Sequence, residues 1–301
     1  MDLILNHIDS FPEIGKEKLA DNMTLTLGSS SAIFASNLSS LGVKVSFIGK
    51  IGNDIFGNFC KEQLELKGVD ISMLIINDEL KTGATVVLNF GDNRANITHQ
   101  GAMKHLGLND ITKEMLSMAK HLHFSSYFLQ PGFKNQLYDL FKLAKDAGLT
   151  TSFDAQWDPE EKWELDYKNV LPYVDVFLPN EQELFKLTGK ETIETALEEI
   201  KDSANVVVVK LGDKGSVSVC NGKTLFRPAF LNHKIVDAIG AGDSFNAGFI
   251  YKFIRDAPIE TCQTFGNVVG AISTTAAGGT SAFTDLKTTM LIAKQKFGYE
   301  E

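Results

Sequence analysis

The sequence predicts an α/β protein built on a doubly wound, mainly parallel sheet, and three observations lead to this class. Short apolar segments alternate along the 301 residues with amphipathic segments of helical spacing. Residues 206–209 are four consecutive valines, which is typical of a parallel strand buried on both faces. The apolar fraction of 44% and the charged fraction of 22% are those of a globular chain with a sizeable core.

The first hundred residues predict a β-α-β rhythm that a hairpin interrupts. The expected elements are strands at 3–8, 23–27 and 43–48, helices at 31–41 and 56–67, an extended piece at 71–75, and hairpin arms at 85–90 and 94–98. Gly42 and Gly68 follow the two helices, where a glycine commonly ends a helix. Gly91, Asp92 and Asn93 tolerate positive φ and form the expected hairpin turn.

The alternation resumes after residue 120. The expected strands are 121–125, 150–153, 174–178, 206–210 and a short piece at 234–236, and the expected helices are 135–147, 181–187, 192–201 and 243–253. Four polar residues stand at or just past the ends of such strands, namely Asp154, Asn180, Lys210 and Asp237. Because ligands bind outside the carboxyl ends of strands in such sheets, we expect the site there.

Charge and cysteine content exclude several classes of function. The net charge of −9 argues against a nucleic-acid partner, whose phosphates need a basic surface. No apolar run approaches the ~20 residues that a membrane-spanning helix needs, and the start has no basic leader region. The three cysteines form no paired spacing, as in proteins of a reducing compartment. A cytoplasmic location without membrane contact is therefore expected.

Residues 237–249 carry the strongest chemical signal. They read Asp-Ala-Ile-Gly-Ala-Gly-Asp-Ser-Phe-Asn-Ala-Gly-Phe, so that Gly240 and Gly242 form a turn and Asp243 stands at the start of an apolar helix. The backbone amides of such a turn and the helix dipole favour an anion. A carboxylate beside an anion site suits a base that takes a hydroxyl proton during phosphoryl transfer. The alternative is that Asp243 only caps the helix.

The same segment closely resembles the Asp-Thr-x-Gly-Ala-Gly-Asp signature of the ribokinase-like (PfkB) sugar kinase family, with Ala238 in the usual place of Thr. Residues 49–57, Gly-Lys-Ile-Gly-Asn-Asp-Ile-Phe-Gly, resemble the N-terminal signature of that family. Asn180 and Glu183 resemble its Asn-x-x-Glu motif. The resemblance runs from Asp2 to about Gly279, in family order and spacing.

The resemblance implies a fold and an assembly. It implies one kinase domain over residues 1–301, a three-layer α/β/α sandwich with eight or nine strands in its sheet, and a small β-sheet lid from 2–27 and 82–100. Relatives often pair through their lids, so a homodimer is expected. Apolar positions of the expected lid strands would be covered in that dimer: Leu3, Ile4, Val86, Leu88 and Ile97.

The resemblance also implies the catalytic roles. Asp243 would be the general base, while the amides of Gly240, Ala241 and Gly242 would neutralise charge on the transferring phosphoryl group. Because a helix N-terminus stabilises an ionised carboxylate, Asp243 is expected to be a weak base.

The nucleotide is expected to be ATP. The positions that resemble the nucleotide edge of the family are Lys210, Gly212, Gly215, Gly242 and Asn267, the last where relatives border adenine. A bland alternative for 210–215 is a tight turn before the next strand. Mg²⁺ is expected at Asn180 and Glu183 through water; a helix cap with a surface glutamate is the alternative. Monovalent-cation (K⁺) binding, if present, belongs near Asp237 and residues 278–280.

The acceptor side departs from the family pattern. Asp2 resembles the substrate-binding aspartate and here is the second residue, which suggests a truncated start or a rebuilt sheet edge. Gly28 and Ser29 stand where many relatives have Gly-Gly, and Ile33 where many have Asn. Arg94 would bind the carboxylate of a sugar acid such as 2-keto-3-deoxygluconate, whereas fructose would not need it; a solvated turn arginine is the alternative.

These departures leave the function open among three alternatives. The expected reaction is ATP-dependent phosphorylation of a sugar or sugar acid. The others are a nucleoside kinase of the same fold and a sugar-sensing relative without turnover. A separate signal, His121 and His123 on one strand face, predicts core histidines rather than a metal pair because no third ligand is suggested.

Overall fold

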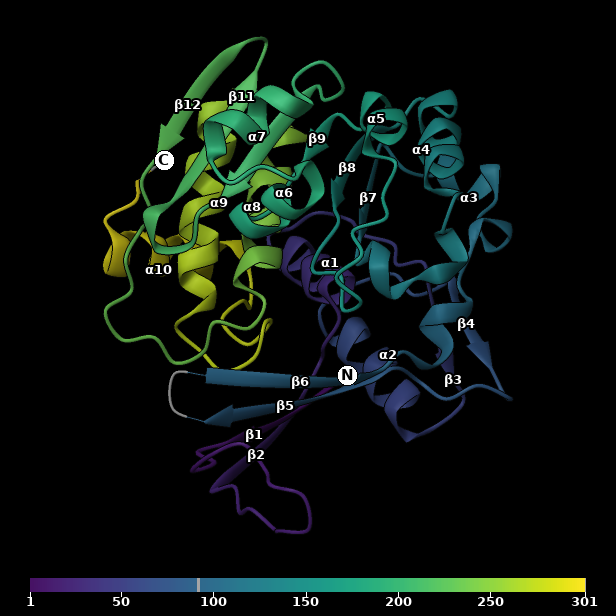
Figure 1. Cartoon of the computed structure of the whole chain (residues 1–301), viewed down its shortest axis with the longest axis vertical. Helices are drawn as coiled ribbons and strands as arrows, with labels where there is room; N and C mark the ends of the chain where they lie inside the picture. The colour runs from purple at the N-terminus through teal and green to yellow at the C-terminus, as the bar shows by residue number, and fades with distance from the viewer. Residues whose placement is uncertain (91–92, 301) are drawn as a thin grey trace.

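The structure is a computed structural model that describes residues 1–90 and 93–300. Its largest sheet has six strands in the order β12-β11-β10-β9-β8-β7 (Figure 1). Its strands are β7 (His121–Ser125), β8 (Thr150–Asp154), β9 (Val176–Phe177), β10 (Val206–Lys210), β11 (Ser216–Cys220) and β12 (Lys223–Arg227). The first four run parallel, and β11 and β12 are antiparallel additions at one edge. The predicted α/β class is confirmed.

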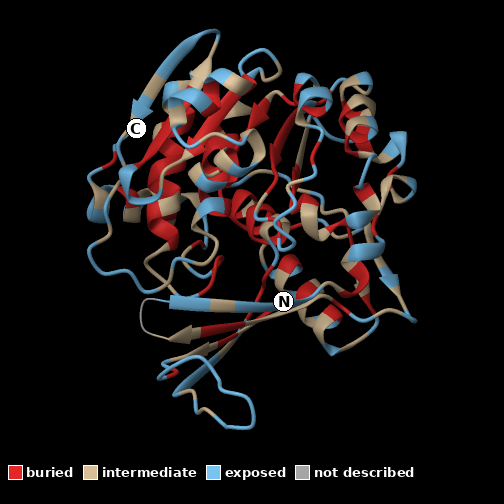
Figure 2. Ribbon diagram, viewed as in Figure 1, coloured by how far each residue is buried: buried red, intermediate tan, exposed pale blue. Residues whose placement is uncertain are grey.

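Helices cover both faces of this sheet. Phe177, Val207 and Val209 pack in the same core cluster as α4 (Leu137–Asp146), α6 (Glu181–Thr188) and α7 (Ile193–Ile200). The intervening side chains of β9 and β10 pack instead with α1 (Ser30–Ser40) and α8 (Ala241–Phe253). Because successive strand residues point to opposite faces, the valine run builds both interfaces of a three-layer sandwich. Figure 2 shows the buried residues concentrated along these strands and helices.

The remaining helices complete the body. They are α2 (Ile55–Leu66), α3 (Lys113–Ser117), α5 (Tyr167–Val170), α9 (Ile259–Ser273) and α10 (Leu286–Phe297). Short 3₁₀ helices lie at Gly101–His105, Leu108–Asp110, Tyr127–Leu129, Pro131–Phe133, Leu171–Tyr173 and Gly212–Lys214. None of the helices in the described part of the chain has both the length and the apolar character needed to cross a bilayer.

A four-stranded sheet, which we call the lid sheet, lies apart from the sandwich, at the bottom of Figure 1. It has the order β2-β1-β5-β6, with β1 (Asp2–Asn6), β2 (Asn22–Thr26), β5 (Ala84–Phe90) and β6 (Asn93–His99). The arms of the predicted hairpin are β5 and β6. Of its expected turn, Gly91 and Asp92 lie outside the described residues.

The register of the lid sheet separates its two faces. Two rows of apolar side chains share one face, Leu25-Leu3-Val86-Ile97 and Met23-Leu5-Leu88-Ala95. Ile4 and Val87 are on the other face and are buried, whereas Leu88 is the buried member of the two rows and the other seven are partly or fully exposed. Ile4 was predicted to share a face with Leu3, and this is wrong because neighbouring strand residues alternate.

Three predicted strand features differ from the structure. The main sheet has six strands instead of eight or nine, because β3 (Gly49–Gly52) and β4 (Leu74–Asn77) pair only with each other. Residues 43–48 form no strand and contribute a single bridge from Ser46 to Asp70. Residues 234–236 are likewise not a strand: Ile235 is 65% exposed, and the segment pairs with none of the strands in the described part of the chain.

Candidate active site

Asp243 lies in the first turn of α8 and is only 7% exposed. The turn before it depends on Gly240, which has a left-handed φ of 72°. A Cβ there would lie 2.8 Å from Gly279 Cα and 3.0 Å from Ile33 Cγ2, so only glycine fits without a shift. Ile33 therefore packs against the two glycine turns. The described residues show Ala241 N donating to Ala238 O at 3.3 Å, so this amide is already engaged.

A chain of side-chain hydrogen bonds reaches Asp243 from α1. Ser30 Oγ donates to Gln156 Oε1 at 2.6 Å, and Gln156 Nε2 donates to Asp243 Oδ1 at 2.9 Å. Gln156 lies two residues after β8, at the carboxyl end where a ligand site was expected. Sequence reasoning missed both Ser30 and Gln156; the place of Gln156 just past a parallel strand was the available signal.

Asp154, at the end of β8, is the buried centre of the same cluster and is 0% exposed. Its Oδ2 accepts from Lys210 Nζ at 2.5 Å and from Asn246 Nδ2 at 2.6 Å. Gln156 Nε2 lies 3.4 Å from the same oxygen. Asn246, one helical turn after Asp243, was also missed. The strands β8 and β10 and the helix α8 thus meet at one carboxylate.

Burial and the negative charge of Asp154 raise the pKa of Asp243 to about 7, against the lowering effects of Lys210 and of the hydrogen bonds from Gln156 and Ser30. The predicted weak base is therefore wrong. The helix N-terminus is outweighed because Asp243 is out of water and faces a second carboxylate. A base with a pKa near neutrality is well matched to proton transfer at physiological pH.

Asn180 and Glu183 form a reciprocal cap at the start of α6. Glu183 N donates to Asn180 Oδ1 at 2.9 Å, and Asn180 N donates to Glu183 Oε2 at 2.8 Å. Glu183 is nevertheless buried, so the surface-glutamate alternative is wrong. Burial and the charge of Asp154 raise the pKa of Glu183 to about 7, while Lys210 lowers it. Burial lowers the pKa of Lys210, but Asp154 and Glu183 outweigh it, and the pKa is raised.

The residues predicted for the nucleotide edge fall into two groups. Gly242 lies close to Lys210, since a Cβ on Gly242 would be 3.6 Å from Lys210 Nζ. Gly212 and Gly215 have φ of 62° and 111° in the connection from β10 to β11. Gly215 also packs so closely that a Cβ would lie 2.1 Å from Arg227 O. The tight-turn interpretation is thus correct for these glycines and is compatible with a ligand beside them.

Asn267, on α9, uses its side chain within the protein. Its Oδ1 accepts from Ser216 Oγ at 3.0 Å, and its Nδ2 donates to Arg227 O at 3.2 Å and to Pro228 O at 3.1 Å. Asn267 therefore fixes the segment that leaves β12, close to the glycine connection. An effect of Asn267 on nucleotide binding would therefore come from its positioning of this segment.

The predicted acceptor residues meet where β1 faces the start of α1. A Cβ on Gly28 would lie 1.9 Å from Asp2 Oδ1, so Asp2 occupies the space that Gly28 leaves open. Burial raises the pKa of Asp2; the chain N-terminus lowers it and Asp237 raises it further. Ser29 has φ 72° and ψ 124°, a backbone conformation that glycine adopts far more readily than serine.

Arg94 is not part of this assembly. It is exposed on β6, opposite Asn89, and takes part in none of the described contacts around Asp243 or Asp2. The predicted cation loops, by contrast, are joined: Asp237 Oδ1 accepts from Ile239 N and its Oδ2 from Gly278 N, both at 2.9 Å.

The two predicted core histidines lie beneath the site on one strand face. His121 Nε2 and His123 Nδ1 each bond Ser152 Oγ at 2.8 Å, and Phe34 stacks on His123. Burial lowers the pKa of His121 to about 4 and lowers the pKa of His123 well below its usual value, so both are neutral. Among the described residues, no three His, Cys, Asp or Glu side chains are placed to hold a metal directly.

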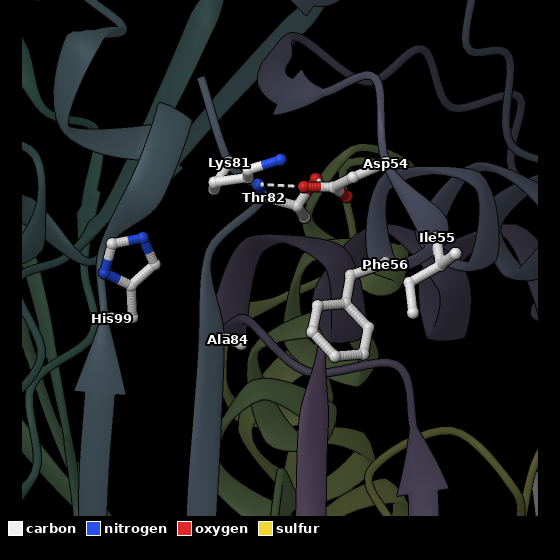
Figure 3. A pocket seen from close by; sticks show the side chains of 7 residues that line it. All are labelled: Asp54, Ile55, Phe56, Lys81, Thr82, Ala84 and His99. Atoms are coloured by element: carbon white, nitrogen blue, oxygen red, sulfur yellow. Dashed lines mark hydrogen bonds between the residues drawn. The ribbon is translucent and has the colours of Figure 1, made fainter. Parts of the chain in front are cut away.

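A cavity of about 410 Å³ lies between the lid sheet and α2. Its lining includes Lys81 and His99, together with Asp54 and Thr82, which are hydrogen-bonded to each other (Figure 3). Asp54 accepts from Thr82 N at 2.9 Å and from Gly57 N at 2.8 Å, so it caps α2 and ties it to the lid sheet. None of the lining residues belongs to the cluster around Asp243, so this cavity is separate from the candidate chemistry.

Comparisons with known proteins agree on one family. A family model described as pfkB family carbohydrate kinase matches residues 1–286. A sugar kinase of Archaeoglobus fulgidus with no assigned substrate is 28% identical, over 78% of this chain and 92% of its own. A nucleoside kinase of Methanothermobacter thermautotrophicus is 25% identical, over 98% of this chain and 93% of its own. The crystal structure of ribokinase from Thermotoga maritima is 27% identical with a TM-score of 0.83, covering 98% of this chain and 96% of that one.

Proposed function

Because this chain belongs to the PfkB family of carbohydrate kinases, we propose that it transfers the γ-phosphoryl group of ATP to a hydroxyl of a sugar or sugar acid, with Asp243 as general base. The observation that carries the proposal is a buried carboxylate with a pKa of about 7, held directly after a glycine turn at a helix N-terminus. The carboxylate takes the hydroxyl proton, and the helix end stabilises the phosphoryl charge.

Other described groups near Asp243 would bind the phosphoryl group and neutralise its charge. The first-turn amides of Gly242 and Asp243 are the donors that the helix leaves open for an anion. Lys210 lies beside Gly242 and provides the nearby positive charge. Most of the rate enhancement is then positioning and electrostatics, as expected for a loose phosphoryl-transfer transition state.

Glu183 is the carboxylate that fits a hydrated Mg²⁺. It lies with Asp154 and Asp243 near Lys210, and burial, followed by the charge of Asp154, raises the pKa values of Glu183 and Asp243. Glu183 Oε1 accepts none of the described hydrogen bonds and is the oxygen available to a bound water. Bound with the nucleotide, the ion would neutralise phosphate charge. Asn180 orients Glu183 through the reciprocal cap.

Asp2 is the residue we assign to the acceptor, since its carboxylate can accept bonds from two sugar hydroxyls. The exposed position of Arg94 favours a neutral sugar over a sugar acid in this conformation. A nucleoside acceptor is the second candidate, because the M. thermautotrophicus relative is a nucleoside kinase. ATP consumption measured across sugars, sugar acids and nucleosides decides among them; binding without turnover would support the sugar-sensing alternative.

Substitution of the base tests the chemistry. Asp243→Asn removes the proton acceptor with little change in shape, so we expect kcat to fall by roughly 10²–10⁴-fold while ATP binding changes little. In the unsubstituted enzyme, kcat/KM should rise as the pH increases through about 7, because the base works only when ionised. An Asp243→Asn enzyme with ordinary turnover would contradict the assignment.

We infer further that the lid sheet closes over the acceptor and pairs two molecules. Its inner face carries the acceptor aspartate, and closure would exclude water and so favour transfer over hydrolysis. Its outer face carries the two apolar rows, which a second copy would cover.

A further inference from the structure

The side chain of Gln156 makes three polar contacts, which join Ser30 to the candidate base Asp243 and to Asp154. Its Oε1 accepts from Ser30 Oγ, and its Nε2 faces two carboxylates, Asp243 Oδ1 at 2.9 Å and Asp154 Oδ2 at 3.4 Å. Turning the amide over would set Oε1 against both carboxylates, an unfavourable contact between acceptors. The chemistry of the partners therefore fixes the orientation of the amide.

The backbone at Gln156 is held in a conformation that glutamine rarely adopts. Its φ is 64°, in the left-handed region that costs a non-glycine residue on the order of 1 kcal/mol. A second hydrogen bond from its own backbone N to Asp154 Oδ1, at 3.3 Å, accompanies this turn. Both the backbone and the side chain of Gln156 are thus directed at the carboxylates of the site.

Two side chains hold the carboxylate of the base. Gln156 Nε2 donates to Asp243 Oδ1, and a hydrogen bond from Ser30 also lowers the pKa of Asp243. At its other end, the chain of bonds starts at Ser30, directly after the Gly28-Ser29 turn that faces Asp2. Gln156 therefore joins the acceptor side to the base side of the site.

We propose that Gln156 is a positioning residue for the kinase reaction, which holds Asp243 through Oδ1 so that the carboxylate faces the acceptor hydroxyl. The proposal rests on the proposed function for its kinetic part. The charged groups that face Asp243 are Asp154 on β8, Lys210 on β10 and Glu183 on α6. Asp154 and Glu183 oppose the ionisation of Asp243. Lys210 and the neutral amide donor of Gln156 favour it.

The first test measures Asp243 without catalysis. Burial raises the pKa of Asp243 from 3.8 to about 7 on folding, so ionisation of this group destabilises the folded state as the pH rises between those values. The stability difference between a protein and its Asp243→Asn counterpart, followed from pH 5 to 9, therefore reports the pKa of Asp243. We would compare this difference in the unsubstituted chain and in Gln156→Met, which keeps the volume and loses the donor.

We compare Gln156→Met with the double variant that also carries Asp243→Asn. The pH at which their stability difference stops changing should be about one unit higher than for the unsubstituted chain, because the ionised carboxylate has lost a hydrogen bond. Gln156→Asn serves as a second variant, since asparagine tolerates a left-handed φ but is one methylene too short to reach Asp243. It should give the same shift. Superimposable curves for the original and either variant pair would overturn the proposal.

The second test is kinetic. For Gln156→Met we expect kcat at pH 7 to fall roughly 10- to 100-fold, the range of a hydrogen bond to a charged group, with less than threefold change in the acceptor KM. The acid limb of the pH profile should move up with the pKa. Gln295→Met, the same change at an exposed position of α10, is the control and should leave both measurements unaltered.

The two tests separate the proposals. An unsubstituted enzyme that phosphorylates no sugar, sugar acid or nucleoside would refute the proposed function, while the stability curves would still decide the role of Gln156. An active kinase whose pH profile and kcat do not respond to Gln156→Met would refute the positioning role alone.

Discussion

Asp243 shows how the environment of one residue decides its chemistry. An aspartate at a helix N-terminus is ordinarily stabilised in its ionised form. Here burial and Asp154 reverse that preference and raise the pKa to about 7. The folded protein holds the proton of Asp243 to higher pH than the unfolded chain does. The contribution of Asp243 to the free energy of unfolding is therefore expected to fall as the pH rises from about 4 to about 7 and to level off above. Burial of Asp243 thus lowers the free energy of unfolding at neutral pH and gives the site a base with a pKa near neutrality.

Gly28 sets the position of the acceptor aspartate at the same scale. Gly28→Ala places a Cβ where Asp2 Oδ1 now lies, 1.9 Å away, so the carboxylate must move. We expect the acceptor KM to rise at least about tenfold and the free energy of unfolding to fall by about 1–3 kcal/mol. Steady-state kinetics and urea unfolding measure the two effects.

Ser29→Gly is the matched substitution at the next residue. Its φ of 72° and ψ of 124° are strained for serine, so glycine should raise the free energy of unfolding by up to ~1 kcal/mol. A lower free energy of unfolding for Gly28→Ala and a higher one for Ser29→Gly would show that the turn has a glycine conformation and that Gly28 leaves space for Asp2. A Gly28→Ala protein with unaltered acceptor KM would contradict the role given to Asp2.

At the scale of the elements, the ion pair between Lys210 and Asp154 ties β10 to β8 beneath the site. Asp154 is fully buried and the Lys210 side chain is 11% exposed, and Lys210→Met would leave Asp154 with only Asn246 and Gln156 as donors among the described residues. An unpaired buried carboxylate costs about 3–5 kcal/mol, so we expect a loss of that order in the free energy of unfolding at pH 8.

Lys145→Met is the control for this loss. Lys145 pairs with Asp175 in a similar geometry, 2.8 Å, but both side chains are partly exposed. Water replaces the partner of such a pair, so the expected loss is at most about 1 kcal/mol. Equal losses for Lys210→Met and Lys145→Met in urea unfolding would show that burial of the Asp154 pair has no special weight.

The elements also show what the sequence could predict. The valine run, the helix stops at Gly42 and Gly68 and the glycine turn before α8 act locally, and each was predicted correctly in kind. The separation of β3 and β4 from the main sheet was missed because sheet membership depends on partners distant in the chain. Ile235 and Val236 have strand propensity but no strand beside them, which propensity alone does not reveal.

The same distinction applies to the candidate site. Asp154 and Lys210 were found because strand ends can be read from the sequence. Gln156 and Ser30 were missed because their meeting depends on how α1 packs against the end of β8. The direction of the Asp243 pKa was also wrong, since a local feature, the helix end, was visible while burial and the second carboxylate were not.

At the scale of the whole molecule, the outer face of the lid sheet predicts a dimer. Its two apolar rows cross four strands, and Ile97 at its edge is 62% exposed. Ile97→Glu would place a charge in the interface, and a charge without a partner there should raise the dimer dissociation constant by at least about 100-fold. Sedimentation equilibrium at micromolar concentration measures this directly.

Asn96→Glu provides the control, because Asn96 is exposed on the same strand but pairs with Val87 on the opposite face. It introduces the same charge one residue away and should leave a dimer intact. If the unsubstituted protein sediments as a monomer, or if Ile97→Glu remains as dimeric as Asn96→Glu, the apolar rows do not form the interface. If only Ile97→Glu dissociates, the face is assigned to a second copy of the chain, and the lid sheet then has an acceptor site on one side and its partner on the other.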